Sequence, residues 1–131
     1  MYLIDANIIL EAMLQQKKTS EVNEFLTKTN LSDCYITDLS LHSIGIRLFR
    51  EKKYHDFVLF LEDIIIDGFK ILILPPIQMK NIEKTARKYS LDFDDAYQYL
   101  AAELNDLQII SFDKDFDKTE KGRKEPGDIK S

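Results

Sequence analysis

Two hydrophobic patterns follow each other in residues 91–117, LDFDDAYQYLAAELNDLQIISFDKDFD. Apolar residues first recur at steps of three, four and seven, the spacing of one face of an α-helix, at Phe93, Ala96, Tyr97, Leu100 and Leu104. A short apolar run over residues 107–111 then has the length of a β-strand. The segment therefore predicts a helix that begins among acidic residues and a strand that ends just before a second group of acids.

The same two patterns alternate along the rest of the chain. Strands are predicted at residues 2–4, 34–37 and 70–74, and the last of these contains ILIL without a polar interruption, as expected for a strand covered on both faces. Helices are predicted between the strands, including one over 54–64 that stops at Gly68 and another whose inner side carries Ile82, Ala86 and Tyr89. The candidate N-caps of the first three helices are Asn7, then Thr19 or Ser20, then Thr37, Asp38 or Ser40.

This alternation of strands and helices predicts an α/β fold. Strands joined through helices form a parallel sheet with right-handed crossovers. The expected architecture is a three-layer α/β/α sandwich around a central, mostly parallel sheet of four or five strands. We expect residues 1–131 to form a single domain with a polar C-terminal tail from about residue 118.

Three acidic residues stand at the ends of predicted elements. Asp5 follows the first strand, Asp95 lies in the first turn of the helix that begins near Phe93, and Asp113 follows the last strand. The carboxyl ends of parallel strands open onto one crevice in such sheets, so these acids are expected to meet there. The apolar stripe puts Asp94 nearer the buried side than Asp95, so periodicity does not choose between these two neighbours.

Carboxylates grouped in this way suit Mg²⁺ or Mn²⁺, which prefer oxygen ligands and keep several waters. A cation held there lowers the pKa of a bound water and neutralises charge on a phosphate under attack. The competing interpretation is structural, because acids at loop starts and helix N-termini are commonly solvated or act as capping groups. Spacing alone favours the structural interpretation slightly.

Composition narrows the choice without deciding it. A net charge of -5 and a pI near 5.0 do not by themselves indicate a nucleic-acid-binding protein. The single cysteine, Cys34, excludes an internal disulfide and fits a reducing cytoplasm, which is the expected location. No apolar run approaches the length of a membrane span, and the N-terminus shows no signal peptide.

Three segments carry a resemblance to a known family: MYLIDANIIL, DDAYQYLAAE and ISFDKDFD. In this order and spacing they resemble the PIN domain family, and within it the VapC-like toxins of toxin–antitoxin pairs. The resemblance implies a Mg²⁺- or Mn²⁺-dependent ribonuclease with a four-acid site. It assigns Asp5, Asp95 and Asp113 as catalytic, metal-binding residues, and so prefers Asp95 to Asp94.

One position departs from the family pattern. The family's second acid is a Glu on the third helix, and Ser43 stands at that place in the stretch Ser40-Leu41-His42-Ser43. A neutral hydroxyl is a poorer Mg²⁺ ligand than a carboxylate. Asp38, near the end of the second strand, is one candidate to compensate, and Asp94 is another through a water molecule.

The resemblance also implies partners: an RNA substrate, a cognate antitoxin protein and a second copy of the chain in a homodimer. An apolar groove around Met13 and Leu14 is the expected dock for the antitoxin. Two basic groups could contact RNA. One lies on the outer side of the helix that contains Ile82, Ala86 and Tyr89, where a solvated helix face is the favoured explanation, and the other lies in the tail, where RNA contact is more plausible. The two groups are Lys80, Lys84, Arg87 and Lys88, and then Lys118, Lys121, Arg123 and Lys124.

Three functional hypotheses therefore remain. The first is a VapC-like endoribonuclease. The second is a PIN-fold protein whose catalysis is weakened or lost through Ser43 and which acts as an RNA-binding or regulatory module. The third, a phosphotransfer receiver, is disfavoured because no clear mid-chain strand ends in a phosphorylatable Asp.

Overall fold

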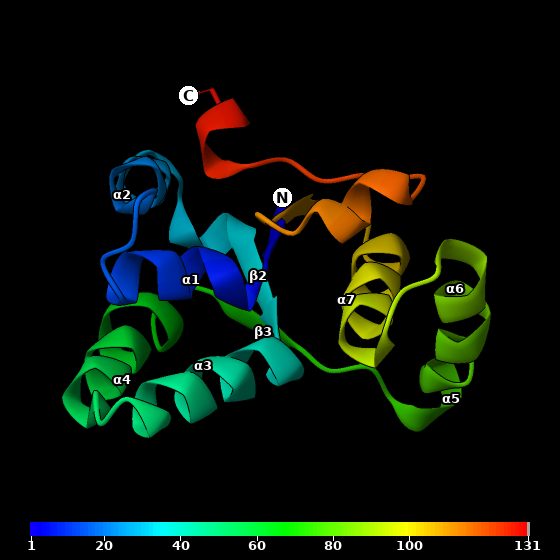
Figure 1. The fold of residues 1–131 in the computed structure, drawn as a ribbon, viewed down its shortest axis with the longest axis horizontal. Helices are drawn as coiled ribbons and strands as arrows, with labels where there is room; N and C mark the ends of the chain where they lie inside the picture. Colours follow the sequence, from blue (N-terminus) through cyan, green and yellow to red (C-terminus); the bar gives the residue numbers. More distant parts are fainter. Residues whose placement is uncertain (131) are drawn as a thin grey trace.

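The computed structural model describes residues 1–130, and it has three layers with a parallel sheet in the middle (Figure 1). Four strands lie in the order β3-β2-β1-β4, with every pair parallel. They span Tyr2–Ile4 (β1), Cys34–Thr37 (β2), Lys70–Leu72 (β3) and Gln108–Ile110 (β4). The register sets Leu3 beside Tyr35 on one side and Ile109 on the other. The fold class predicted from the sequence is confirmed.

Helices cover both faces of this sheet, and the sheet divides the hydrophobic core into two clusters (Figure 1). One core lies under α1 (Ala6–Met13), α2 (Thr19–Lys28), α3 (Asp38–Arg50) and α4 (Tyr54–Phe60). The other lies under α5 (Pro76–Met79), α6 (Ile82–Tyr89) and α7 (Phe93–Leu104). Neighbouring strand residues serve opposite cores, because Leu3 belongs to the second cluster and Ile4 to the first, as the pleat of a strand requires.

Short helical turns complete the chain. They are η1 (Leu31–Asp33), the π-helix η2 (Leu61–Ile65), η3 (Lys114–Lys118) and η4 (Pro126–Asp128). The predicted helix over 54–64 is thus an α-helix that continues as a π-helical turn, and Gly68 lies in the turn that follows it.

The capping predictions had mixed outcomes. Thr37 is the N-cap of α3, and its hydroxyl accepts a hydrogen bond from Ser40 N at 3.1 Å, as predicted. The prediction for Asn7 was wrong, since Asp5 is the N-cap of α1 and the Asn7 side chain reaches across to Ser111. The prediction for the second helix was also wrong, because α2 begins after Lys18 without a side-chain cap.

The prediction that the third strand is covered on both faces was wrong. β3 forms one edge of the sheet and pairs only with β2 within the described chain. Its residue Ile71 is exposed, and Ile73 just beyond it is 66% exposed. An uninterrupted apolar run has the same sequence whether a helix or a partner molecule covers it, so the pattern could not distinguish the two.

The polar tail folds back over the sheet rather than leaving it. Lys124 forms a parallel bridge with Ile110, and its backbone N–H donates to Ile109 O at 2.9 Å. Pro126 and Thr119 are buried. Within residues 1–130, no helix is long and apolar enough to cross a membrane.

Candidate metal centre

The predicted acids come together at the carboxyl ends of β1 and β4. Asp5, Asp95 and Asp113 all line one pocket of about 380 Å³, and Asp94 joins them at its edge. The parallel arrangement causes this, because β1 and β4 are direct neighbours and α7 begins beside their ends. The three positions are thus neighbours in space, while their roles as ligands stay a prediction.

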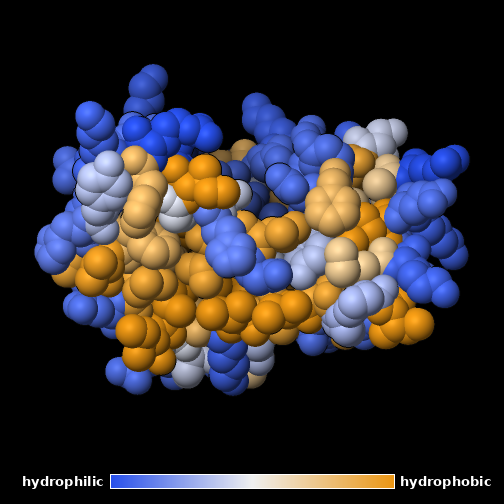
Figure 2. Space-filling model, turned by 90° about the horizontal axis from the view of Figure 1, so that it is seen from below, coloured by the Kyte–Doolittle hydropathy of each residue, from blue (hydrophilic) through white to orange (hydrophobic). Residues whose placement is uncertain are grey.

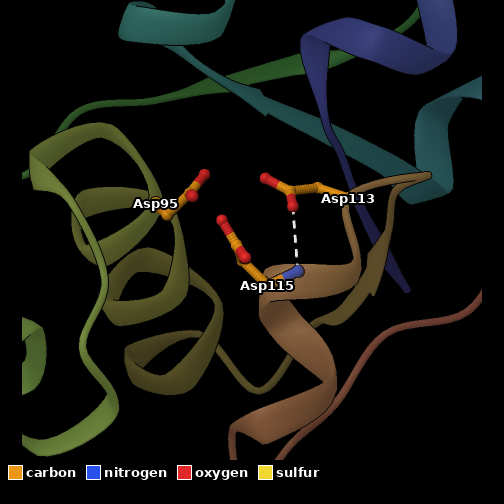
Figure 3. A group of neighbouring side chains, drawn as sticks. All are labelled: Asp95, Asp113 and Asp115. Carbon is orange, nitrogen blue, oxygen red and sulfur yellow. Dashed lines mark hydrogen bonds between the residues drawn. The ribbon is translucent and has the colours of Figure 1, made fainter.

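A tighter cluster lies within this region and includes a residue that sequence reasoning missed. Carboxylate oxygens of Asp95, Asp113 and Asp115 all lie within 4.8 Å of one another (Figure 3). Asp113 is the N-cap of η3, and its carboxylate accepts a hydrogen bond from Asp115 N at 2.9 Å. The Asp-x-Asp spacing after β4 was the sequence signal for Asp115, since an Asp side chain can accept a hydrogen bond from the backbone two residues on and so turn the second acid toward the first.

Hydrogen bonds hold Asp5 at the base of the pocket. The Ser111 hydroxyl donates to Asp5 Oδ2 at 2.6 Å, and Asn7 Nδ2 donates to the same oxygen at 3.2 Å. The same Ser111 oxygen accepts from Asp113 N at 2.9 Å, so it joins the two acids. Asn7 and Ser111 therefore orient the carboxylates, which is why the Asn7 side chain is not free to cap α1.

Crowding and burial shift the acid–base properties of these groups. Burial, and then the charges of Asp113, Asp92 and Asp5, raise the pKa of Asp95 to about 8. Burial also raises the pKa of Asp5, against the opposing effect of the Ser111 hydrogen bond. Carboxylates that repel one another in this way are the anionic oxygen donors that a divalent cation requires, so the residues fit Mg²⁺ or Mn²⁺.

The choice between Asp94 and Asp95 has a structural answer. Asp94 is exposed, while Asp95 is half-buried and belongs to the three-carboxylate cluster. The periodicity that put Asp94 nearer the buried side was misleading, because every residue of α7 from Ala96 to Ala102 is buried. A helix covered on nearly all sides has no single apolar stripe.

Ser43, the position on α3 that departs from the family pattern, lies at the acid pocket. Ser43 is exposed and lines the same pocket as the acids. Asp38 does not replace the missing carboxylate, because it accepts a hydrogen bond from the Tyr97 hydroxyl at 2.7 Å and does not line the pocket. Nearby, Ser40 donates to Gln98 Oε1 at 3.3 Å, so the α3 residues Ser40 and Ser43 present hydroxyl groups to the pocket in place of a carboxylate.

Part of the basic tail is occupied elsewhere. The Arg123 side chain is only 10% exposed and binds Asp117, Glu125 and the carbonyl of Ser111. This arginine stabilises the segment after β4 and is not free to contact RNA. The basic group on α6, in contrast, is exposed.

Comparison with known proteins supports the fold and the family. A family model described as "PIN domain" matches residues 2–122. Among solved structures, a toxin–antitoxin complex from Klebsiella pneumoniae aligns with TM-score 0.77 and 18% identity, covering 96% of this chain and 98% of that one. FitAcB from Neisseria gonorrhoeae aligns with TM-score 0.74 and 19% identity, covering 98% and 100%. No curated protein sequence matches the chain.

Proposed function

The chain belongs to the PIN domain family, and from this premise we propose that it is a metal-dependent endoribonuclease of the VapC type, the toxin of a type II toxin–antitoxin pair. The observation that carries the proposal is the cluster of Asp95, Asp113 and Asp115, with Asp5 in the same pocket. Such a toxin would act on RNA in the cytoplasm.

The residues of the chain have separate tasks in this mechanism. Asp95, Asp113 and Asp115, with Asp5 alongside, would hold Mg²⁺ or Mn²⁺, which supplies Lewis acidity to activate water and to neutralise the phosphodiester. Ser111 and Asn7 keep the Asp5 carboxylate directed at the pocket through their hydrogen bonds. Asp95 would give up its proton when a cation binds, because a cation reverses the repulsion that raises its pKa.

The test of this proposal is RNA cleavage by the purified protein. Asp5→Asn keeps the size of the side chain and its ability to accept from Ser111, but it removes the charge. We expect cleavage to depend on Mg²⁺ or Mn²⁺ and to fall at least a hundredfold in this variant. The variant should still show a cooperative thermal unfolding transition, which verifies that it is folded. Cleavage that survives both the substitution and excess chelator would disprove the proposed chemistry.

A second candidate function rests on Ser43. The pocket receives no carboxylate from α3, so cation affinity could be too weak for catalysis, and the protein would then bind RNA or regulate without cutting it. RNA binding without metal-dependent cleavage, together with a gain of cleavage in Ser43→Glu, would favour this second function.

For the antitoxin, we propose a dock between α1, α2 and α4. A cavity of about 290 Å³ there is lined by apolar residues that include Ile9, Met13, Leu26 and Leu59. A cavity with this apolar lining suits the apolar face of an amphipathic helix. Met13→Asp should abolish binding of the proposed antitoxin in a co-purification assay, while RNA cleavage by the variant alone stays intact.

For the homodimer, we propose the face that carries α3, α4 and α5. Figure 2 shows a band of apolar side chains across this face. Exposed apolar residues of these elements and of the β3 edge include Ile46, Phe49, Val58, Ile73 and Ile77. So many exposed apolar side chains indicate a protein interface. Light scattering should give a dimer mass for the wild type and a monomer mass for Ile73→Asp.

A further inference from the structure

The pocket that contains the acids has two walls of different charge. The acids Asp5, Asp94, Asp95 and Asp113 come from the ends of β1 and β4 and from α7. The opposite wall is α3, which contributes no carboxylate to the lining but two arginines, Arg47 and Arg50. With Ser43 in place of an acid, the pocket is negative on one side and positive on the other.

The residues of α3 that line the pocket share one face of the helix. Ser43, Arg47 and Arg50 follow each other at steps of four and three, with Ile46 between them. At a rise of 1.5 Å per residue, Arg47 stands about 6 Å and Arg50 about 10 Å beyond Ser43 along the helix axis. The two arginines therefore follow Ser43 in a row along the side of α3 that lines the pocket.

Both arginines retain free hydrogen-bond donors. Arg47 donates from Nε to Glu51 Oε2 at 2.6 Å, and within residues 1–130 its terminal nitrogens make no hydrogen bond. Arg50 is exposed and, in the described part of the chain, makes neither a hydrogen bond nor an ion pair. Arg123 shows the opposite state, since its side chain is 10% exposed and paired with two carboxylates.

We propose that Arg47 and Arg50 form a phosphate-binding track for the RNA strand, beside the acids that hold the cation. The inference rests on the proposed function and names the residues that bind the substrate next to the point of cleavage. Guanidinium groups match phosphate in geometry and stay charged at any working pH. The cation would neutralise the acidic wall, and the arginines would bind phosphates of the nucleotides that flank the cut.

The same arginines could instead bind the carboxylates of an acidic peptide. The geometry favours phosphate, because the track opens directly onto a cluster suited to a cation, and phosphates bridge a cation and a guanidinium readily. A carboxylate-rich peptide would gain from the arginines but would add negative charge beside Asp94 and Asp95. The experiment includes this alternative.

The test compares charge-matched variants in the cleavage-deficient Asp5→Asn protein with Mn²⁺ present. Binding of a fluorescein-labelled single-stranded RNA of roughly 12 nucleotides is followed by anisotropy over a range of salt concentrations. The test variant is Arg47→Gln/Arg50→Gln. The control, Lys17→Gln/Lys28→Gln, removes the same charge from two exposed positions that do not line the acid pocket.

We expect the α3 variant to raise the Kd at least tenfold at low salt. The slope of log K against log salt should become shallower by about 1.4, the value for two phosphate contacts on a single strand. Arg47→Lys/Arg50→Lys should keep most of the slope, and the control should match its parent. Circular dichroism verifies that each variant is folded.

Unchanged RNA binding in the folded α3 variant, or an equal loss in the Lys17→Gln/Lys28→Gln control, would overturn the phosphate track and leave the proposed function intact. A glutamate-rich peptide that binds through these arginines while RNA binding does not need them would also overturn it. If the wild-type chain neither binds nor cleaves RNA, the proposed function itself fails, and the track fails with it.

Discussion

Replacing Asp95 with asparagine should stabilise the metal-free protein while removing its response to metal. The pKa of Asp95 is about 8 in the folded protein, because the carboxyl is half-buried beside other acids. The ordinary pKa of an aspartate side chain is 3.8. The unfolded chain therefore loses this proton as pH rises through about 4, whereas the folded chain keeps it until about 8. Unfolding is favoured throughout that window, so stability falls as pH rises, and Asp95→Asn removes this dependence.

The magnitude follows from the difference between the two pKa values. A separation of about 4 corresponds to about 6 kcal/mol if the group were fully shielded, at about 1.4 kcal/mol per pH unit. Asp95 is partly open to solvent, which screens the repulsion and reduces the expected gain at pH 7 to about 1–2 kcal/mol. For a chain of this size, this is a rise of roughly 3–8 °C in Tm.

The assay is thermal unfolding in excess chelator at several pH values from 4 to 8, followed by circular dichroism. Asp95→Asn should match the wild type near pH 4 and unfold at increasingly higher temperature than the wild type toward pH 8. Mn²⁺ should then raise the Tm of the wild type but not of the variant. The control is Asp67→Asn, which replaces an exposed acid that does not line the pocket. A variant no more stable than the wild type at pH 7 would refute the reasoning.

Three further predictions follow from single contacts. Ser43→Glu adds a carboxylate to the wall of the acid pocket and should tighten Mn²⁺ binding at least tenfold by calorimetry; unchanged affinity would show that this side chain does not reach the cation. Tyr97→Phe removes a buried hydroxyl that accepts from Leu74 N at 2.8 Å and donates to Asp38, so urea unfolding should show a loss of about 1–3 kcal/mol. A loss below the error of the measurement would contradict that role. Arg123→Gln breaks nearly buried ion pairs and should lower stability by about 1–3 kcal/mol, and an unchanged urea midpoint would show that the tail is not fastened by this residue.

The alternation of elements and the positions of the strand ends were available from the sequence. Hydrophobic periodicity is a local property, and the short strands left no ambiguity about where Asp5 and Asp113 follow an apolar run. The rule that parallel strands present their carboxyl ends at one edge then predicts that these acids lie close together. Ser43 was singled out by the family resemblance rather than by periodicity, as the α3 position without the expected carboxylate, and Ser43 does line the pocket.

Other features depended on what packs against each element from a distance. α7 is covered on nearly all sides, so its own pattern could not say that Asp95 is half-buried and Asp94 exposed. The apolar run of β3 could not reveal that the strand lies at the open edge of the sheet. Two sets of contacts join residues that no sequence rule pairs. Tyr97 binds Asp38, and Arg123 binds Asp117 and Glu125. Sequence determines which groups are available at each element's end, whereas tertiary packing decides which of them remain free, because a buried polar group must find a partner wherever the fold supplies one.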